Sequence, residues 1–287
     1  MELPKIIFSH KSCENENGII SNIDCNEIDL YIVMTRICNV NCPFCTYHQN
    51  KEISPVDIDK VKETLDELSK ICYVRTIHFT GGEPTLKLDK IVEICEYAKK
   101  IFPYVRTSVN TNGSFLSSLR GLQCLDNIAL SRHHYNDEIN REIFKSNLPP
   151  TSEAIASFPD RAKIHLSCNL IKGYIDNEQK LEDYLEFSSH IDVNDIGIVS
   201  LMDNCKYSID NFVDFEKFDL SKIKNLQKCR CYCNKDENNI PLCKCENYLY
   251  LSKNMHLISM YHRYAIKHND IASYLVYENN QLTQGFK

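Results

Sequence analysis

Three cysteines lie close together in one short segment of the chain. Cys38, Cys42 and Cys45 have the spacing C-x3-C-x2-C within the run MTRICNVNCPFCTYH. A cubic 4Fe–4S cluster is normally held by four cysteines, so a loop with three leaves one iron open to a ligand that is not protein. The pattern therefore predicts an iron–sulfur cluster at which chemistry can occur.

A structural zinc site is the alternative interpretation of this motif. Zinc in structural sites is tetrahedral and needs four ligands, and the three cysteines supply only three. His48 follows closely and could be the fourth ligand. Zinc therefore stays open as an alternative when the motif is considered alone.

A second motif, Gly81-Gly82-Glu83-Pro84, follows about 40 residues after the cysteine loop. Two glycines let the backbone approach a ligand closely, and the proline stiffens the exit from the turn. Alone, such a run is more often an ordinary turn. Its position one strand and one helix after the cysteine loop favours a shared site instead.

Alternating strand and helix patterns must position these two motifs. Such alternation is typical of parallel strands joined by crossover helices. A first helix is predicted to begin at Pro55, with Ser54 as its cap, and others are predicted over 88–101 and 178–190. The predicted strands are 28–35, 76–80, 105–111, 127–133, 163–171 and 195–202. These units predict an α/β fold, a partial (βα)6 TIM-like barrel whose functional groups gather at the C-terminal strand ends.

The composition changes after about residue 202. The barrel core is assigned to residues 1–202, with a short lead-in over 1–27 before the first strand. Residues 203–287 are polar and rich in cysteine, and they end in the hairpin-like runs NYLYLSKN and SYLVYENNQL. We predict that they form a small appended module that binds a metal.

The two motifs together resemble those of the radical S-adenosylmethionine (SAM) enzymes, over about residues 28–202. The resemblance implies that the three cysteines hold a 4Fe–4S cluster whose open iron chelates the amino and carboxylate groups of SAM. It also implies that Phe44 lies near the adenine. Glu83, beside Gly81 and Gly82, would accept a hydrogen bond from the methionyl ammonium.

Similarity to the molybdenum-cofactor cyclase and peptide-modifying branches extends further along the chain. It implies that Asn110 in VNTNG faces SAM, and that Ser131 and Asn169 contact its ribose or carboxylate. Side chains alternate along a strand, so His165 would share the interior face with Asn169, whereas Cys168 would point toward the helices. We therefore expect Cys168 to be a packing residue rather than a hydrogen-atom donor.

Arg132, His133 and His134 follow the fourth predicted strand, at the end where functional groups gather. His133 has the parity of Ser131 and would point inward, so it is our candidate for a catalytic residue that touches the substrate. Arg132 and His134 are expected to be structural or solvent-facing.

A second group of cysteines lies near the end of the chain. Its members are Cys229, Cys231, Cys233, Cys243 and Cys245, with Cys205 as a sixth candidate. Thiols that alternate this closely are natural where sulfur atoms converge on a metal. Many radical SAM enzymes carry an auxiliary cluster in a C-terminal extension, so we predict a second 4Fe–4S cluster, with zinc as the alternative.

Composition and charge limit the classes of partner. The 287 residues carry a formal net charge of −6, with 33 Lys+Arg against 39 Asp+Glu, which gives no overall attraction to nucleic acid. No apolar run reaches the roughly 18–20 residues of a membrane-spanning helix. The odd count of 15 cysteines favours metal ligation over disulfides. We therefore expect a cytoplasmic protein that binds neither membrane nor nucleic acid.

The resemblance predicts an enzyme that reductively cleaves SAM to a 5′-deoxyadenosyl radical and abstracts hydrogen from its substrate. It would be an oxidoreductase, a transferase or a lyase, and it would need a one-electron donor such as flavodoxin or ferredoxin. The auxiliary module favours a peptide or natural-product precursor, although the short lead-in leaves no separate leader-recognition domain. A small-molecule or nucleotide substrate is the alternative.

Two further expectations concern activity. The C-terminus lacks the glycine-rich tail of the molybdenum-cofactor cyclase, so that activity is not transferred to this chain. A non-catalytic iron–sulfur or zinc scaffold is the alternative from another class, and it predicts metal without formation of 5′-deoxyadenosine.

Overall fold

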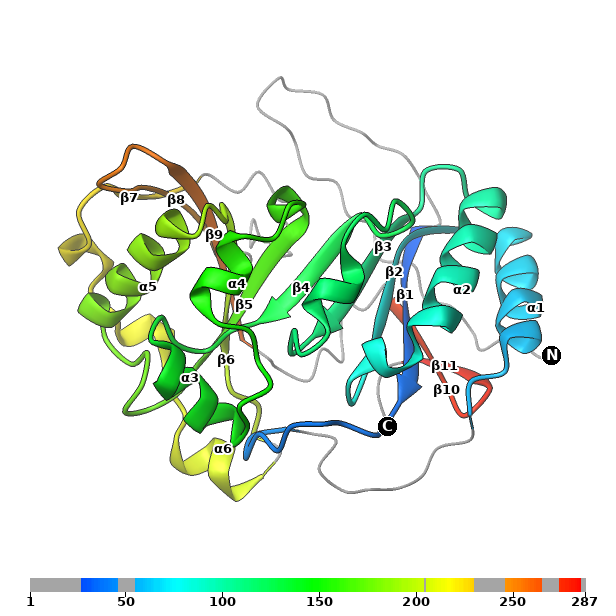
Figure 1. Ribbon diagram of the computed structural model, residues 1–287, viewed down its shortest axis with the longest axis horizontal. Coiled ribbons are helices and arrows are strands. Elements are labelled where there is room, and N and C mark those ends of the chain that lie inside the picture. Colours follow the sequence, from blue (N-terminus) through cyan, green and yellow to red (C-terminus); the bar gives the residue numbers. More distant parts are fainter. Residues whose placement is uncertain (1–26, 46–54, 204, 230–245, 265–273, 285–287) are drawn as a thin grey trace, which may run out of the picture.

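A computed structural model describes residues 27–45, 55–203, 205–229, 246–264 and 274–284 (Figure 1). Eleven strands of this part of the chain form one sheet, in the order β11-β10-β1-β2-β3-β4-β5-β6-β9-β8-β7. Their bounds are β1 Glu27–Thr35, β2 Tyr73–Gly81, β3 Arg106–Thr111, β4 Asn127–Ser131, β5 Ile164–Leu170, β6 Asp195–Ser200, β7 Leu226–Lys228, β8 Glu246–Leu251, β9 Leu257–Tyr264, β10 Tyr274–Glu278 and β11 Gln281–Gln284.

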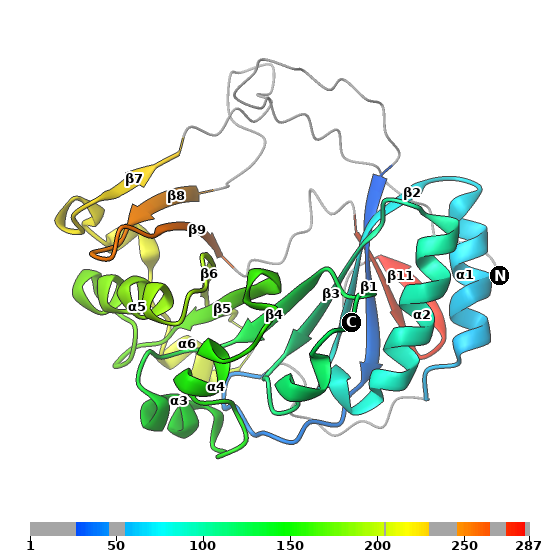
Figure 2. The same ribbon diagram turned by 45° about the horizontal axis from the view of Figure 1, so that its top comes forward.

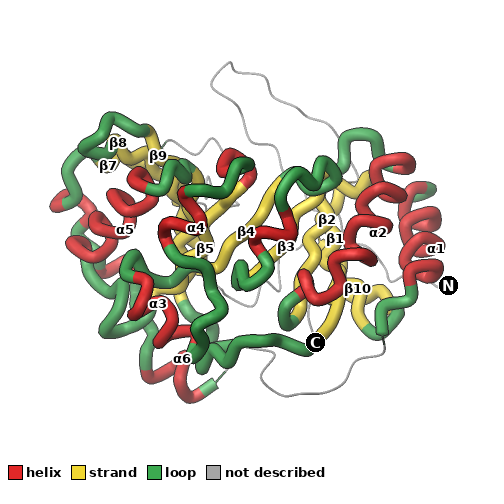
Figure 3. Tube along the Cα trace, viewed as in Figure 1, coloured by secondary structure: helices red, strands yellow, loops and turns green. Residues whose placement is uncertain are grey.

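Helices connect the strands of the central sheet and pack against it (Figure 3). Their bounds are α1 Ile58–Ser69, α2 Leu88–Ile101, α3 Asp137–Phe144, α4 Ser152–Ala156, α5 Glu178–His190 and α6 Lys206–Asp210. The helix α1 begins at Ile58 and not at Pro55 as predicted, because Asp57 is its cap: the Asp57 side chain accepts hydrogen bonds from the backbone N–H groups of Asp59 and Lys60. The buried stripe of α1 includes Val61, Leu65 and Leu68, as its spacing predicts.

Strands β1 to β6 are parallel neighbours in chain order. The segment after residue 203 was expected as an appended module, but its strands extend this same sheet at both sides. Strand β10 pairs in parallel with β1, and β9 pairs in parallel with β6. The parallel part of the sheet is therefore eight strands wide, and Figure 2 shows it curving from α1 at one end to α5 at the other.

Side chains on the two faces of the sheet differ in character. Along β5, Leu166 and Cys168 belong to the apolar core beneath the helices, with 0% exposure. His165, Ser167 and Asn169 alternate with them and lie on the opposite, interior face. Cys168 is a packing residue, as the alternation predicts.

No helix within the described ranges is long and apolar enough to cross a membrane.

Candidate active site

The cysteine loop leaves the C-terminal end of β1 and is anchored by its backbone. The Cys45 N–H donates to the Cys42 carbonyl at 3.1 Å, which closes a turn within the motif. The Asn41 N–H donates to the Phe144 carbonyl at the end of α3, also at 3.1 Å. Cys42 is buried, and Cys38 and Cys45 are partly buried. The three thiols are therefore held in a shielded loop.

The environment of these thiols opposes their ionisation in the absence of metal. Burial raises the pKa of Cys42, and the charges of Cys45 and Cys38 raise it further. Burial also raises the pKa of Cys38, to which the Glu83 carboxylate contributes. A cationic metal centre would reverse this balance by binding the thiolates and releasing their protons.

The Gly81-Gly82-Glu83 turn lies directly against the entrance to the cysteine loop. The Gly82 N–H donates to the Thr35 carbonyl at 2.7 Å, and the Glu83 N–H donates to the Ile37 carbonyl at 2.9 Å. A Cβ on Gly82 would lie 2.2 Å from the Ile37 oxygen, and Gly81 has a φ of +125°. Both glycines are therefore required for the close approach of these two segments.

Glu83 is completely buried, and the protein supplies its hydrogen bonds. Its Oε1 accepts from the Thr85 N–H at 3.1 Å, the Thr85 hydroxyl at 2.5 Å and the Thr111 hydroxyl at 2.7 Å. Its Oε2 accepts from the Asn112 N–H at 2.8 Å. The carboxylate is thus fixed in position by groups from the turn and from the end of β3.

Asn112 connects Glu83 to the cysteine loop. Its side-chain amide donates to the Asn39 Oδ1 at 2.8 Å and approaches the Cys38 Sγ at 3.8 Å. Sequence reasoning singled out Asn110 in VNTNG and missed Asn112. Strand β3 ends at Thr111, so Asn112 turns away from the strand toward the loop, whereas the proposed contact of Asn110 with SAM stays a prediction.

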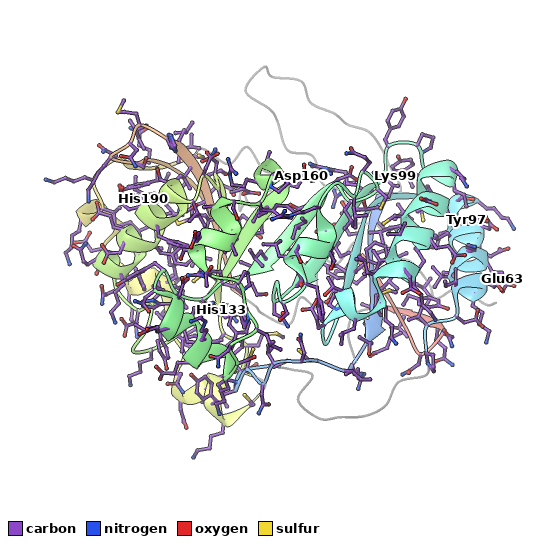
Figure 4. All side chains as sticks on the ribbon, viewed as in Figure 1. Glu63, Tyr97, Lys99, His133, Asp160 and His190 are labelled. Carbon is purple, nitrogen blue, oxygen red and sulfur yellow. The ribbon has the colours of Figure 1, made fainter. Side chains whose placement is uncertain are left out.

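An aromatic cluster covers the other side of the loop. The ring of Phe44 meets the ring of His133 edge-on, with centroids 5.1 Å apart, and His133, which is labelled in Figure 4, stacks on Phe144 of α3 at 4.9 Å. The His133 Nδ1 accepts from the Asn169 N–H at 3.1 Å. Burial lowers the pKa of His133 to about 3, with a further contribution from Arg132. His133 is therefore a neutral ring packed next to Phe44, and its contact with substrate stays a prediction.

Arg132 is a structural residue. Its side chain is 1% exposed and pairs with Asp137 at the start of α3, at 2.5 Å. It also donates to the carbonyls of His134, Pro150 and Tyr135. The guanidinium thereby ties together the segments that follow β4.

Ser131 and Asn169 lie near the C-terminal ends of β4 and β5. Ser131 is in register with Ser167, two residues before Asn169, so the two predicted SAM contacts share the interior face of the sheet. This placement agrees with their expected orientation. Their contacts with SAM remain predictions.

The C-terminal cysteines were predicted to form a second metal site. Cys205 lies beside the first cysteine loop, where its Sγ is 3.7 Å from the Pro43 carbonyl oxygen. Cys229 follows β7, and its N–H donates to the Asn247 carbonyl. The other four candidates lie outside the described residues: Cys231, Cys233, Cys243 and Cys245. A metal site formed by these residues stays a prediction. His48, the possible fourth zinc ligand of the first loop, also lies outside the described residues, so its role stays a prediction too.

The donor set of the first loop fits a 4Fe–4S cluster. No three Cys, His, Asp or Glu side chains within the described segments are placed to share one metal ion. In a cubic cluster each thiolate binds a different iron, so three cysteines do not need to converge on one point. The Asn112 amide also provides a hydrogen-bond donor toward the Cys38 sulfur, the kind of contact that tunes such clusters.

Comparison with known proteins defines the class. The radical SAM superfamily model matches residues 32–188, and the chain belongs to that superfamily. Membership implies a 4Fe–4S cluster and SAM, and it makes the protein a radical SAM enzyme.

Individual relatives are similar over part of their length. A probable GTP 3′,8-cyclase from Saccharolobus islandicus is 31% identical over 185 residues, which are 60% of this chain and 56% of the relative. A probable GTP 3′,8-cyclase from Thermococcus kodakarensis is 29% identical over 175 residues, which are 56% of this chain and 53% of the relative. The chain therefore spans about half the length of these curated relatives.

Solved structures confirm the fold class. Streptococcus suis SuiB bound to S-adenosylmethionine matches with a TM-score of 0.52 at 15% identity, over 63% of this chain and 42% of SuiB. A partial TIM-like α/β barrel, as predicted, is therefore the architecture of the core.

Proposed function

We propose that Cys38, Cys42 and Cys45 hold the cluster and that SAM binds between this loop and Glu83. The observation that carries this proposal is the hydrogen-bonded connection from Glu83 through Asn112 to the cysteine loop. When bound, the cluster supplies the electron that cleaves SAM to a 5′-deoxyadenosyl radical, which removes hydrogen from the substrate.

The chain's own residues bind and orient SAM in this proposal. Glu83 is held by Thr85, Thr111 and Asn112 before any ligand arrives, so little reorganisation is needed to accept an ammonium group. Phe44, held edge-on by His133, offers a ring beside the adenine. In this proposal the interior face of the curved sheet would limit the access of water to the reacting atoms.

For the substrate we favour a small molecule with a planar ring, such as a purine nucleotide. A pair of rings lies on the interior face: Tyr31 stacks on His78 with centroids 4.5 Å apart. Aromatic and imidazole rings of this kind suit a planar ligand. The relatives named as probable GTP 3′,8-cyclases support the same class, which makes GTP the first probe.

A peptide or natural-product precursor, predicted from the sequence, is the second candidate. Its support is the cysteine-rich segment that follows residue 203, because auxiliary clusters often accompany peptide substrates in this superfamily. Iron that remains in the Cys38/Cys42/Cys45→Ala variant would identify the C-terminal cysteines as a second cluster.

Anaerobic reconstitution tests the proposal. The wild type and a Cys38/Cys42/Cys45→Ala triple variant are assayed for iron, sulfide, zinc and 5′-deoxyadenosine, with strong reductant and with GTP present or absent. We expect the wild type to cleave SAM faster with GTP, and the triple variant to lose about four irons and all cleavage. Cys72→Ala, in the connection between α1 and β2, is the control and should keep both.

Three results would count against the proposal. A wild type that contains zinc but no iron would support the structural zinc site. A wild type that contains iron but leaves SAM intact would support a non-catalytic scaffold. SAM cleavage that is indifferent to GTP would remove GTP as the substrate and leave the cluster assignment standing.

A further inference from the structure

Three polar side chains from adjacent strands form a hydrogen-bonded chain away from the cysteine loop. The Asp195 carboxylate of β6 lies 2.9 Å from the His165 Nδ1 of β5. The His165 Nε2 lies 3.0 Å from the Tyr261 hydroxyl of β9. The order of the chain is therefore Asp195, His165, Tyr261.

The fold makes room for this chain at one glycine. Gly197 is in register with Ser167 on one side and with Tyr261 on the other. A Cβ on Gly197 would lie 2.6 Å from the Tyr261 hydroxyl and 2.7 Å from the His165 Nε2. Without that Cβ, the two rings lie nearly parallel, at an interplanar angle of 7°.

A neutral His165 would give the two hydrogen bonds one direction. A carboxylate oxygen accepts, so the imidazole proton would lie on Nδ1, facing Asp195. Nε2 is then an acceptor, and it receives the hydrogen bond of the Tyr261 hydroxyl. The phenolic oxygen keeps lone pairs that can accept a proton as its own proton moves to His165.

The chain also connects two different environments. Tyr261 and His165 lie on the interior face of the sheet, which they share with Ser167 and Asn169. The His165 side chain is 8% exposed, whereas that of Asp195 is 55% exposed. Asp195 begins β6, so it lies at the end of the sheet opposite the cysteine loop. A proton could thus pass from the interior to water at the far end.

We propose that Tyr261, His165 and Asp195 form a proton relay that removes a proton from the substrate radical; this role rests on the proposed function. Hydrogen abstraction next to a hydroxyl or amino group makes the remaining O–H or N–H more acidic. That proton passes to the Tyr261 oxygen while the Tyr261 proton passes to the His165 Nε2. Asp195 stabilises the imidazolium, which then releases its proton to water; this step moves one proton and leaves the unpaired electron on the substrate.

Turnover with GTP as the probe separates the relay from SAM cleavage. Tyr261→Phe and His165→Gln should form 5′-deoxyadenosine within twofold of the wild-type rate, because abstraction precedes proton transfer. Product formed per 5′-deoxyadenosine should fall about 100-fold, the order expected for general acid–base catalysis. The solvent deuterium isotope effect on product formation should disappear in both variants. Tyr97→Phe removes a hydroxyl bonded to Asp66 outside the barrel and should change nothing (Figure 4).

A purely structural role predicts a different result. In that case the variants would have a lower unfolding temperature and a lower rate of SAM cleavage, and the solvent isotope effect on product formation would remain. This result would overturn the relay. Unchanged coupling of product to 5′-deoxyadenosine in Tyr261→Phe would overturn it as well.

The relay can be tested even if GTP is not converted. Nitrogen-15 spectra of labelled histidine in the reconstituted protein report which ring nitrogen of His165 carries the proton. We expect the Nδ1–H form, with an Nε2 resonance that moves in Tyr261→Phe and an Nδ1 resonance that moves in Asp195→Asn. An Nε2–H form, or resonances indifferent to both variants, would overturn the relay independently of the substrate.

Discussion

The buried Glu83 carboxylate accepts hydrogen bonds from three different residues, and each of its two oxygens accepts at least one. A glutamine amide has only one oxygen, so it cannot replace both acceptors. Glu83→Gln places an NH₂ group against at least one donor. We expect a loss of about 2 kcal/mol in the free energy of unfolding, because a buried donor is left without a partner. Urea unfolding of the two proteins measures it.

Glu93→Gln is the matched control for that change. Glu93 is half exposed and pairs with Lys62 on the surface, at 2.7 Å. An exposed pair of this kind contributes about 0–1 kcal/mol. Equal losses in the two variants would contradict the special position of Glu83.

His133 should make stability depend on pH. Burial lowers the pKa of His133 in the folded protein to about 3, below the ordinary value of 6.5. Between these two values the unfolded chain binds a proton at His133 and the folded protein does not. Stability therefore falls as the pH drops below 6.5, and the full loss is reached near pH 3. We expect His133→Phe to reduce the loss between pH 6 and pH 5 by about 1 kcal/mol. Urea unfolding at both pH values measures it, and an unchanged difference would contradict the neutral state.

Among elements, the contact between the Gly81-Gly82-Glu83 turn and the cysteine loop sets the shape of the site. A Gly82→Ala side chain would meet the Ile37 and Arg36 carbonyl oxygens, so the loop must move. We expect the variant to retain less than half of the iron of the wild type after reconstitution, since a displacement of about 1 Å is enough to disrupt a preorganised site. Iron and sulfide analysis provides the measurement.

Gly121→Ala separates this steric effect from a general loss of stability. Gly121 has a φ of +68°, and its Cβ would find nothing within 4 Å. The variant should lose about 1 kcal/mol of stability and keep its iron. Loss of iron in both variants would show that lowered stability alone accounts for the effect.

Local sequence patterns were sufficient for most elements of the core. The predicted helices 88–101 and 178–190 coincide with α2 and α5, because a buried stripe and, for α5, the Asn177 cap mark their limits. The cysteine loop and the glycine turn were likewise evident from residue types. Asn112 was missed, since only the end of β3 at Thr111 decides which asparagine of VNTNG reaches the loop.

At the scale of the whole molecule, the C-terminal segment completes the sheet on both sides. Its hairpin-like runs were recognised from the sequence, but their pairing with β6 and β1 was not. The hydrophobic pattern of a strand shows which of its faces is buried, and it does not show which distant strand lies beside it. What looked like a separate module is in part the wall of the barrel. His165 and Tyr261 meet only because of this pairing.

Leu275 of β10 tests how far stability depends on that pairing. It is 2% exposed and in register with Leu30 of β1. We expect Leu275→Ala to lower the free energy of unfolding by about 2–5 kcal/mol, as for other buried leucines. Leu257→Ala on β9, where the side chain is 56% exposed, should cost much less in the same urea titration. Similar costs would indicate that β10 is not integral to the core.

The two outermost strands have a consequence for self-association. An open row of backbone N–H and C=O groups at the edge of a wide sheet can recruit strands from other molecules and seed aggregates. Here the sheet ends in β7, with 3 residues, and β11, with 4, each antiparallel to its neighbour. Within the described residues, both outermost strands of the sheet are therefore short. Short outer strands offer few backbone groups for recruiting another molecule, which lowers the tendency of this open sheet to seed fibrils.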